Sequence, residues 1–193
     1  MRVLDEPLPG VRILELPISR DERGFFARAY CRDGLAGLGV DFPIVQANVS
    51  ASPRPGTLRG LHYQLPPSAE TKLVRCLSGA VWDCVLDLRP RSPTFGRWVG
   101  YELSVHNHRA ILVPPGCAHG FLTLEPDALV LYFVSAAYDP RRERGVRWND
   151  PNFAIAWPFP PSLVSPRDRA HPDFDPSYHL NVDRRENAPC APS

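Results

Sequence analysis

The chain has 193 residues, a length that suits one domain with a substantial hydrophobic core. Its 22 Lys and Arg residues nearly balance its 21 Asp and Glu residues, which excludes a global electrostatic attraction to nucleic acid or to an anionic membrane. The five cysteines are scattered and form no C-x-x-C pair, so we expect reduced thiols. No apolar run approaches the roughly 20 residues that cross a bilayer, and the N-terminus lacks the apolar core of a signal peptide. We therefore expect a soluble, cytoplasmic protein.

Short segments rich in Val, Ile, Leu and aromatic residues, separated by many of the 23 prolines and 13 glycines, indicate an all-β domain. In chain order we expect strands at residues 11–16, 25–30, 44–50, 58–64, 72–77, 80–88, 97–103, 110–113, 120–124 and 128–135. A short helix is expected over 31–38, and the proline-rich segment 158–179 holds only brief helical turns. Because no long helical pattern supplies the crossovers of a parallel sheet, the strands predict an antiparallel sandwich or jelly roll. We assign residues 1–182 to one domain and expect 183–193 to be a disordered tail.

Two segments are candidates for chemistry: 58–64, which contains His62, and 114–121, which fits the P-x-G-x-x-H half of the cupin signature. A metal-binding cupin needs His-x-His and Glu from the first segment and His from the second, because a redox metal takes three or four converging N or O ligands. Here Gln64 stands where the second histidine would be, and the only His-x-His, at 106–108, falls in a predicted turn. The sequence therefore favours a site without metal, and a metal-binding cupin stays as an alternative enzyme class.

At these motifs the chain resembles the dTDP-4-dehydrorhamnose 3,5-epimerase family, from about residue 11 to about residue 168. The resemblance is carried, in order, by segments 21–26, 46–50, 58–64, 72–75, 91–96, 115–121 and 148–151. It implies a cupin jelly roll that works as a homodimer without metal or cofactor. It also implies inversion of the carbons that flank the C4 ketone of a nucleotide-linked 6-deoxy-4-ketohexose. Relatives that invert only C3 or only C5 keep the stereochemical outcome open.

Removing a proton from a carbon next to a ketone requires a base, a positive charge for the enolate oxygen and an acid on the opposite face. His62 suits the base, because an imidazole with an unperturbed pKa of about 6.5 is largely neutral at working pH, and the resemblance makes it the family's base. The resemblance also implies that Lys72 lies near the keto oxygen and that Tyr132 is the proton donor, a role open to a protonated phenol. A proton delivered from the far face inverts the carbon, whereas its return by His62 only exchanges it with solvent.

An imidazole base needs a partner that fixes its tautomer and raises its basicity. Asp168 sits where the family places the carboxylate of its His–Asp dyad, and it is our first choice. Asp83 and Asp87, on a predicted strand, are the competing carboxylates. The sequence alone leaves the choice among the three open.

The nucleotide end of such a substrate needs cations, because guanidinium groups match phosphate oxygens. Arg59 and Arg23 are the candidates for the diphosphate. The resemblance further implies that Arg23 and Phe26 reach into the site of the neighbouring subunit, in a dimer that exchanges strands. By the same resemblance the pocket is completed by Gln46, Asn48, His119 and Tyr138, the last of them near the nucleotide base. His119 is equally compatible with a structural role.

Two positions depart from the family pattern. Arg28 stands where the family commonly carries an acidic residue, and Phe133 stands where a lysine often follows the tyrosine. These departures leave the nucleotide carrier and the inverted carbon open, and a cupin that binds sugar nucleotides without catalysis remains a further alternative. His171 and His179, in the proline-rich segment, are expected at the surface.

Overall fold

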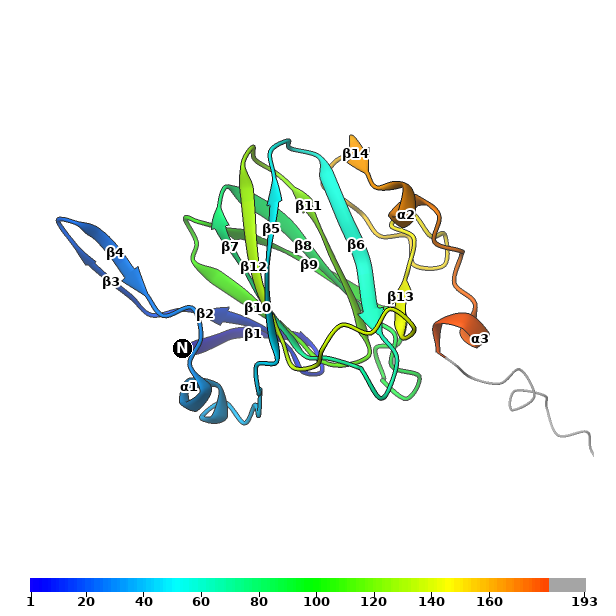
Figure 1. Cartoon of the computed structure of the whole chain (residues 1–193), viewed down its shortest axis with the longest axis horizontal. Coiled ribbons are helices and arrows are strands. Elements are labelled where there is room, and N and C mark those ends of the chain that lie inside the picture. Colours follow the sequence, from blue (N-terminus) through cyan, green and yellow to red (C-terminus); the bar gives the residue numbers. More distant parts are fainter. Residues whose placement is uncertain (181–193) are drawn as a thin grey trace, which may run out of the picture.

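Two mainly antiparallel sheets, stacked face to face, form the body of the protein in the computed structural model, which describes residues 1–180 (Figure 1). The first sheet has the order β1 (Arg2–Leu8), β2 (Val11–Glu15), β10 (Arg109–Val113), β7 (Lys72–Ser78), β12 (Ala128–Val134) and β5 (Gln46–Ser52). The second has the order β13 (Glu143–Gly145), β6 (Thr57–Gln64), β11 (Cys117–Thr123), β8 (Ala80–Asp87) and β9 (Trp98–Ser104), with β14 (Leu163–Val164) parallel to β6. The expected all-β jelly-roll sandwich is confirmed.

Apolar side chains from both sheets pack in the space between them. The main cluster joins Val74 and Val130 of the first sheet to Val85 and Phe121 of the second, and all four are buried. Successive side chains of a strand point to opposite faces, so each strand sends one set of residues into this layer. The burial of this apolar surface is the dominant favourable contribution to folding.

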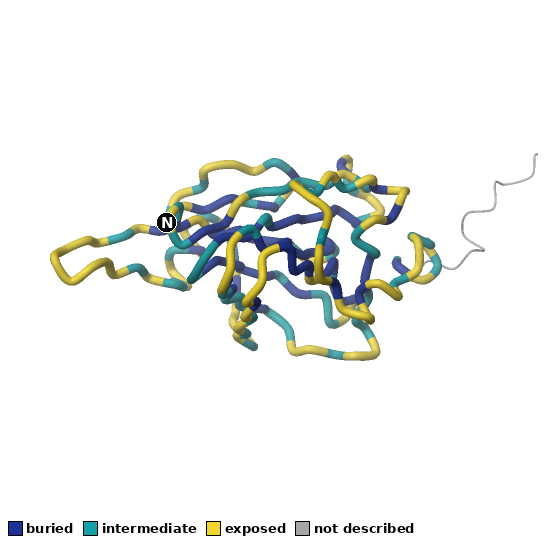
Figure 2. The backbone as a smooth tube through the Cα atoms, turned by 90° about the horizontal axis from the view of Figure 1, so that it is seen from above, coloured by how far each residue is buried: buried dark blue, intermediate teal, exposed yellow. Residues whose placement is uncertain are grey.

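A hairpin and three short helices lie outside the sandwich. Their bounds are β3 (Ile18–Asp21), β4 (Gly24–Ala27), α1 (Arg32–Ala36), α2 (Pro166–Arg169) and α3 (Pro176–His179). The hairpin of β3 and β4 extends away from the body (Figure 1), and its tip is exposed (Figure 2). Helices α2 and α3 lie on the opposite side of the molecule, near β6 and β13 (Figure 1). The longest of these helices has five residues, so none in the described part of the chain could span a membrane.

The central strands agree with the sequence prediction, and the differences lie at the edges. Segment 25–30 is wrong as a single strand, because the strand ends at Ala27 and pairs with β3, which the pattern does not predict. Strands β1, β13 and β14 are also absent from the prediction. β1 is mostly exposed and carries charges and a proline, and the other two have three and two residues, too few for alternation to be visible. The tail expected at 183–193 lies outside the described residues.

His179 is fully buried, so the prediction that it lies at the surface is wrong. Its Nε2 lies 3.2 Å from the carbonyl oxygen of Gly145, and its own carbonyl accepts a 2.8 Å hydrogen bond from the hydroxyl of Tyr63. Burial lowers the pKa of His179, although hydrogen bonds with the backbone of Asp175 and Gly145 oppose the shift. A neutral imidazole thus holds the C-terminal segment against β6 and β13.

Asp87, at the end of β8, is a buried carboxylate whose oxygens are fully engaged in a turn. Its Oδ2 accepts hydrogen bonds of 2.6 Å from Ser92 and from Thr94, and Arg89 Nη2 lies 2.8 Å from the same atom. Burial alone would raise the pKa of Asp87, but the bonds from Arg89, Ser92 and Thr94 outweigh it and lower the pKa to about 2. Asp87 therefore stabilises the turn between β8 and β9.

The Asp87→Asn variant should lower the free energy of unfolding at pH 7 by about 2 kcal/mol, the worth of bringing one carboxyl pKa down to about 2. A folded-state pKa below the unfolded value of about 3.9 contributes stability that is complete above that value and declines as the pH falls toward 2. Urea denaturation should therefore show a smaller difference from the unmodified protein at pH 3 than at pH 7. Asp41→Asn, at an exposed loop position, is the control and should show almost no change at either pH. An equal Asp87→Asn effect at both pH values would contradict the assignment.

Candidate active site

A pocket of about 720 Å³ lies between the two sheets. Its walls come from β5, β7 and β12 of the first sheet, from β6 and β11 of the second, and from the segment that carries α2. It is lined by all the site residues expected from the sequence except Arg23 and Phe26, namely His62, Lys72, Tyr132, Asp168, Gln46, Asn48, Arg59, His119 and Tyr138. The fold thus gathers into one cavity residues that are widely separated along the chain.

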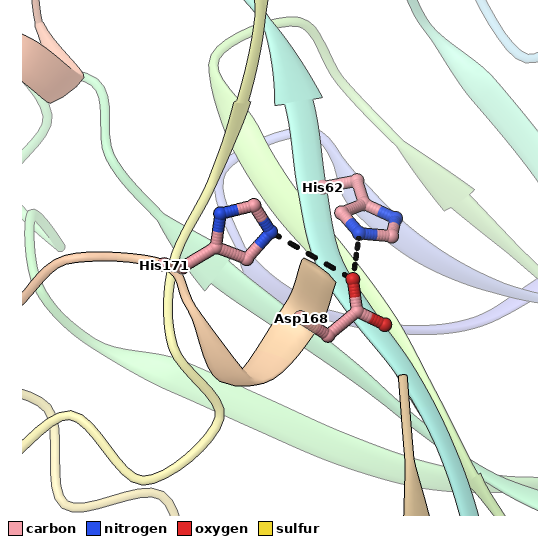
Figure 3. A group of neighbouring side chains, drawn as sticks. All are labelled: His62, Asp168 and His171. Carbon is pink, nitrogen blue, oxygen red and sulfur yellow. Dashed lines mark hydrogen bonds and ion pairs between the residues drawn. The ribbon is translucent and has the colours of Figure 1, made fainter. Parts of the chain in front are cut away.

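His62 and Asp168 both line this pocket, and the imidazole of the first meets the carboxylate of the second (Figure 3). His62 Nε2 lies 2.7 Å from Asp168 Oδ1, and the backbone N–H of Gly60 donates to Asp168 Oδ2 at 3.3 Å. Asp168 is placed by α2, whose first turn is capped because Ser165 Oγ accepts a 3.0 Å hydrogen bond from the N–H of Asp168. The strand and the capped helical turn together fix the two side chains against each other.

Asp168 is held in its charged form. Burial by itself raises the pKa of Asp168, but His171, the hydrogen bond and charge of His62, and the Gly60 amide outweigh it and keep the pKa well below its usual range. An ionised carboxylate only accepts hydrogen bonds, so the proton of a neutral His62 ring sits on Nε2. The other ring nitrogen, Nδ1, makes no hydrogen bond within residues 1–180, and the His62 side chain is 32% exposed. This tautomer leaves the lone pair of Nδ1 free to accept a proton.

The competing carboxylates bind other partners. Asp83 lies on β8 and its two oxygens are 3.0 and 2.9 Å from Nε2 of His119. Asp87 is engaged in its turn. Of the three candidates that the sequence left open, Asp168 is the one that contacts His62. His119 stands directly opposite His62 in the pairing of β11 with β6, so a second His–Asp pair borders the first.

Lys72 is held rigidly beside the histidine strand. Its Nζ donates a 3.0 Å hydrogen bond to the carbonyl oxygen of His62 and lies 3.3 Å from Oε1 of Glu70. The other oxygen of Glu70 accepts from Nε2 of Gln64 at 2.7 Å. Lys72, Glu70 and Gln64 are all buried, so the ammonium is fixed in the wall of the pocket by an opposite charge and a carbonyl. The sequence did not single out Glu70 or Gln64 as partners.

Tyr132 faces the pocket from β12. Burial raises the pKa of Tyr132; Arg59 lowers it, and the carboxylates of Glu70 and Glu143 raise it further. The net upward direction keeps the phenol protonated at neutral pH. Phe133, the next residue, points to the other face of the strand and packs against Tyr30 at a ring distance of 5.8 Å. This departure from the family pattern is therefore separated from the pocket by the strand itself.

A second polar cluster, which the sequence did not reveal, lies at the edge of the pocket. Glu143 Oε2 accepts a 2.6 Å hydrogen bond from the hydroxyl of Tyr138 and forms an ion pair with Arg167, whose Nη2 donates to the same oxygen. Burial raises the pKa of Glu143, but the bonds from Tyr138 and Arg167 outweigh it, so the carboxyl group stays charged. Arg167 directly precedes Asp168 on α2. This neighbouring position was the only feature of the sequence that could have identified Arg167 as a residue of the site.

Other polar residues of the pocket lining bond to neighbouring backbone or side-chain groups. Arg59 Nη2 donates to the carbonyl oxygen of Ala51 at 3.0 Å, and Gln46 Nε2 donates to Oδ1 of Asn48 at 2.8 Å. Arg28, the other departure from the family pattern, is exposed and does not line the pocket. Its Nη1 lies 3.8 Å from Sγ of Cys31.

Arg23 and Phe26 lie on the hairpin of β3 and β4, which projects from the body (Figure 1). Neither residue lines the pocket of its own chain. The Arg23 side chain is 85% exposed and pairs with Asp21 at 2.5 Å, and Phe26 is 71% exposed. Within one chain these two residues therefore take no part in the site.

His171, expected at the surface, instead lies against the dyad, so that prediction is wrong. Its side chain is only 11% exposed, and its Nε2 is 3.7 Å from Asp168 Oδ1 (Figure 3). One possible metal-binding group occurs among the described residues: His62, Asp168 and His171, whose ligand atoms all lie within 4.8 Å of one another. Gln64 and His119, at the positions where a metal-binding cupin has ligands, are instead bonded to Glu70 and Asp83.

Comparison with known proteins agrees with the geometry. The family model described as dTDP-4-dehydrorhamnose 3,5-epimerase matches residues 5–176. The dTDP-4-dehydrorhamnose 3,5-epimerase of Shigella flexneri is 43% identical over 171 residues, which cover 87% of this chain and 93% of that protein. The crystal structure of the Bacillus anthracis enzyme of the same name, with TDP and PPi bound, has a TM-score of 0.87 at 44% identity and covers 90% of this chain and 99% of that one. ChmJ, a 3'-monoepimerase from Streptomyces bikiniensis in complex with dTDP-quinovose, has a TM-score of 0.82 at 35% identity, with coverages of 91% and 89%.

The sandwich and its pocket thus define a cupin-like epimerase. Within that class, the chain belongs to the dTDP-4-dehydrorhamnose 3,5-epimerase family.

Proposed function

We propose that this protein epimerises a dTDP-linked 4-keto-6-deoxyhexose, dTDP-4-dehydro-6-deoxyglucose, at C3 and C5 through an enolate. The observation that carries the proposal is the 2.7 Å contact between His62 Nε2 and Asp168 Oδ1, which leaves Nδ1 as a free base at the pocket. The names of the relatives support the substrate, since TDP or a dTDP-sugar is bound in the solved structures of the Bacillus anthracis enzyme and of ChmJ.

In this mechanism His62 Nδ1 removes the proton from the carbon next to the C4 ketone. The imidazolium that forms is stabilised by the charged carboxylate of Asp168, which already holds the proton on Nε2. The carboxylate needs no rearrangement during the step because Gly60 and the capped turn of α2 hold it in place.

Lys72 and Tyr132 supply the other two roles. Lys72 supplies a positive charge that stabilises the enolate oxygen. Its ammonium is held in the pocket wall by Glu70 and by the carbonyl oxygen of His62. Tyr132 comes from the opposing sheet and is protonated, so it donates a proton to the carbon on the face away from His62. Inversion follows from this arrangement of base and acid on opposite sheets.

The nucleotide binds at the outer part of the pocket in this proposal. Arg59 contacts the diphosphate, Tyr138 lies beside the thymine, and Arg167 adds a second guanidinium that the sequence did not suggest. The polar groups of Gln46, Asn48 and His119 complete the binding surface.

The protein works as a homodimer in which each hairpin completes the site of the partner. The support is the position of the hairpin: it projects from the body and exposes Phe25 and Phe26, at 48% and 71%, beside a charged Arg23 that serves no site in its own chain. Exposed aromatic side chains next to an arginine are typical of residues that bury at an interface.

A 3-epimerase is the second candidate, because the chain is 35% identical to a 3'-monoepimerase. A deuterium experiment separates the two candidates and tests the proposed roles. Incubation with dTDP-4-dehydro-6-deoxyglucose in D₂O should place deuterium at both C3 and C5, read by NMR, whereas a 3-epimerase labels C3 alone. Absence of deuterium at both carbons would refute the proposal and leave a binding protein without catalysis.

Two variants assign the roles in the same experiment. His62→Asn should slow exchange by about 10² to 10⁴-fold, the usual contribution of a general base. Tyr132→Phe should lose inversion more strongly than exchange, because His62 still removes a proton and returns one from solvent on the same face. Equal loss of exchange and inversion in Tyr132→Phe would contradict its assignment as the acid.

Complementation between two inactive variants tests the shared site. In a mixed dimer of His62→Asn and Arg23→Ala chains, one of the two pockets has an intact His62 and receives an intact Arg23 from its partner. Unfolding and refolding an equal mixture gives half mixed dimers by random pairing, so about a quarter of the normal activity should return if Arg23 acts across the interface. No recovery would show that Arg23 does not serve the partner's site.

A further inference from the structure

His171 brings a second imidazole to the catalytic carboxylate, but its Nε2 atom lies 3.7 Å from Asp168 Oδ1, beyond hydrogen-bond distance. The Nε2 atom of His171 is buried and makes no hydrogen bond within residues 1–180, although it points at Asp168 Oδ1 from 3.7 Å (Figure 3). Buried ring nitrogens normally have a hydrogen-bond partner. A buried nitrogen that faces a carboxylate from beyond hydrogen-bond distance therefore indicates a position suited to a ligand.

The second sheet provides the space for the His171 ring at Gly145. Gly145 of β13 stands opposite His62 in the pairing with β6, and a Cβ atom on Gly145 would come within 2.0 Å of His171 Nε2. The absent side chain leaves the room that the His171 ring occupies. The ring lies edge-on to that of His62, with centroids 5.8 Å apart at 76°.

We propose that His62, Asp168 and His171 form a binding site for a divalent metal ion of the zinc type. Two imidazoles and one carboxylate are the donors of many catalytic zinc sites, in which water takes the fourth position. The three ligand atoms lie within 4.8 Å of one another, and zinc bonds of about 2.0–2.2 Å hold such atoms about 3.3 Å apart in a tetrahedron. The 3.7 Å gap between His171 and Asp168 closes by a small shift, and the 2.7 Å contact of His62 widens once the metal replaces the shared proton.

Binding of the metal switches the catalytic base off, a consequence that rests on the proposed function. A neutral imidazole that ligates through Nε2 carries its proton on Nδ1. The nitrogen that removes the substrate proton is then itself protonated and cannot accept another. The site is thus inhibitory, and the epimerisation itself proceeds without the metal.

The nature of the donors predicts which ions act. Imidazole nitrogens suit Zn²⁺ and Co²⁺, whereas Mg²⁺ prefers oxygen ligands and retains its water. Inhibition should therefore follow Zn²⁺ and Co²⁺ and be absent with Mg²⁺.

Metal binding is measured first without any catalysis. Calorimetric titration of the full, chelator-treated chain with ZnCl₂ should show zinc binding. The zinc affinity of His171→Asn should be tenfold or more lower, a loss of about 1.4 kcal/mol in binding free energy. The same titration with CoCl₂ should give the visible absorption of nitrogen-ligated Co²⁺ in the unmodified chain and lose it in the variant. His106→Asn, which removes an exposed histidine on a turn, is the matched control and should bind like the unmodified chain. His171→Gln serves as a second variant, and thermal unfolding without metal checks the folding of each.

Deuterium exchange with and without ZnCl₂ then tests whether the bound metal inhibits proton removal by His62. The exchange rate of each variant is compared with its own rate without metal. Exchange by the unmodified chain should stop on adding zinc and return with chelator, and exchange by His171→Asn should resist the same zinc concentration. Zinc affinity and cobalt absorption unchanged in both His171 variants would overturn the metal site while leaving the proposed function intact. Zinc that binds through His171 without slowing exchange would overturn the inhibition and the role of His62 Nδ1. A chain without exchange at any zinc level would refute the proposed function and leave the metal titration as the test of the site.

Discussion

The hydrogen bond between His62 and Asp168 is the contact on which the rest of the site depends. It joins residues 106 positions apart in the sequence, one on a central strand of the second sheet and one on a four-residue helix that follows the last strand. The helix can hold its aspartate there because Ser165 caps it and Pro166 begins it. The C-terminal segment beyond it is secured by the buried His179. A large part of the chain after the sandwich therefore serves to bring one carboxylate to one imidazole.

The cost of burying charge explains why the ionisable groups of the pocket occur in pairs. Removing a charge from water is costly unless another group compensates it. Three ionisable groups in and beside the pocket each have a partner: Lys72 has Glu70, Asp83 has His119, and Glu143 has Tyr138 and Arg167. Fixed partners hold the side chains in position before a substrate arrives. Such preorganisation is the main source of electrostatic catalysis, because the charges need not rearrange as the enolate forms.

The sequence predicted the central strands of the sandwich and most of the residues that line the pocket, and the physical reasons for its errors are specific. His62, Lys72 and Tyr132 lie on strands with clear patterns, so motif and strand together place them. Asp168 could only be ranked above Asp83 and Asp87, because no local pattern encodes a contact over 106 positions. That residues 1–182 fold as one domain stays a prediction.

The largest errors concern the C-terminal segment. His171 and His179 look like surface residues because they stand among prolines and polar residues, and a segment without periodicity gives no sign of which side chains it buries. The position of His171 depends on the space that Gly145 leaves on β13, and the position of His179 depends on the carbonyl oxygen of the same glycine. Contacts with backbone that is distant in the sequence cannot be predicted from the local pattern of residues. The cluster of Glu143 and Arg167 was unpredictable for the same reason.

The proposed chemistry requires that a charged Asp168 holds the His62 proton on Nε2 and leaves Nδ1 as the base. The most direct measurement is the ¹⁵N spectrum of histidine-labelled, metal-free protein at a pH where His62 is neutral, with the His62 signals assigned by comparison with His62→Asn. We expect a protonated Nε2 and an unprotonated Nδ1. A proton on Nδ1, with Nε2 bare beside the carboxylate, would contradict this mechanism.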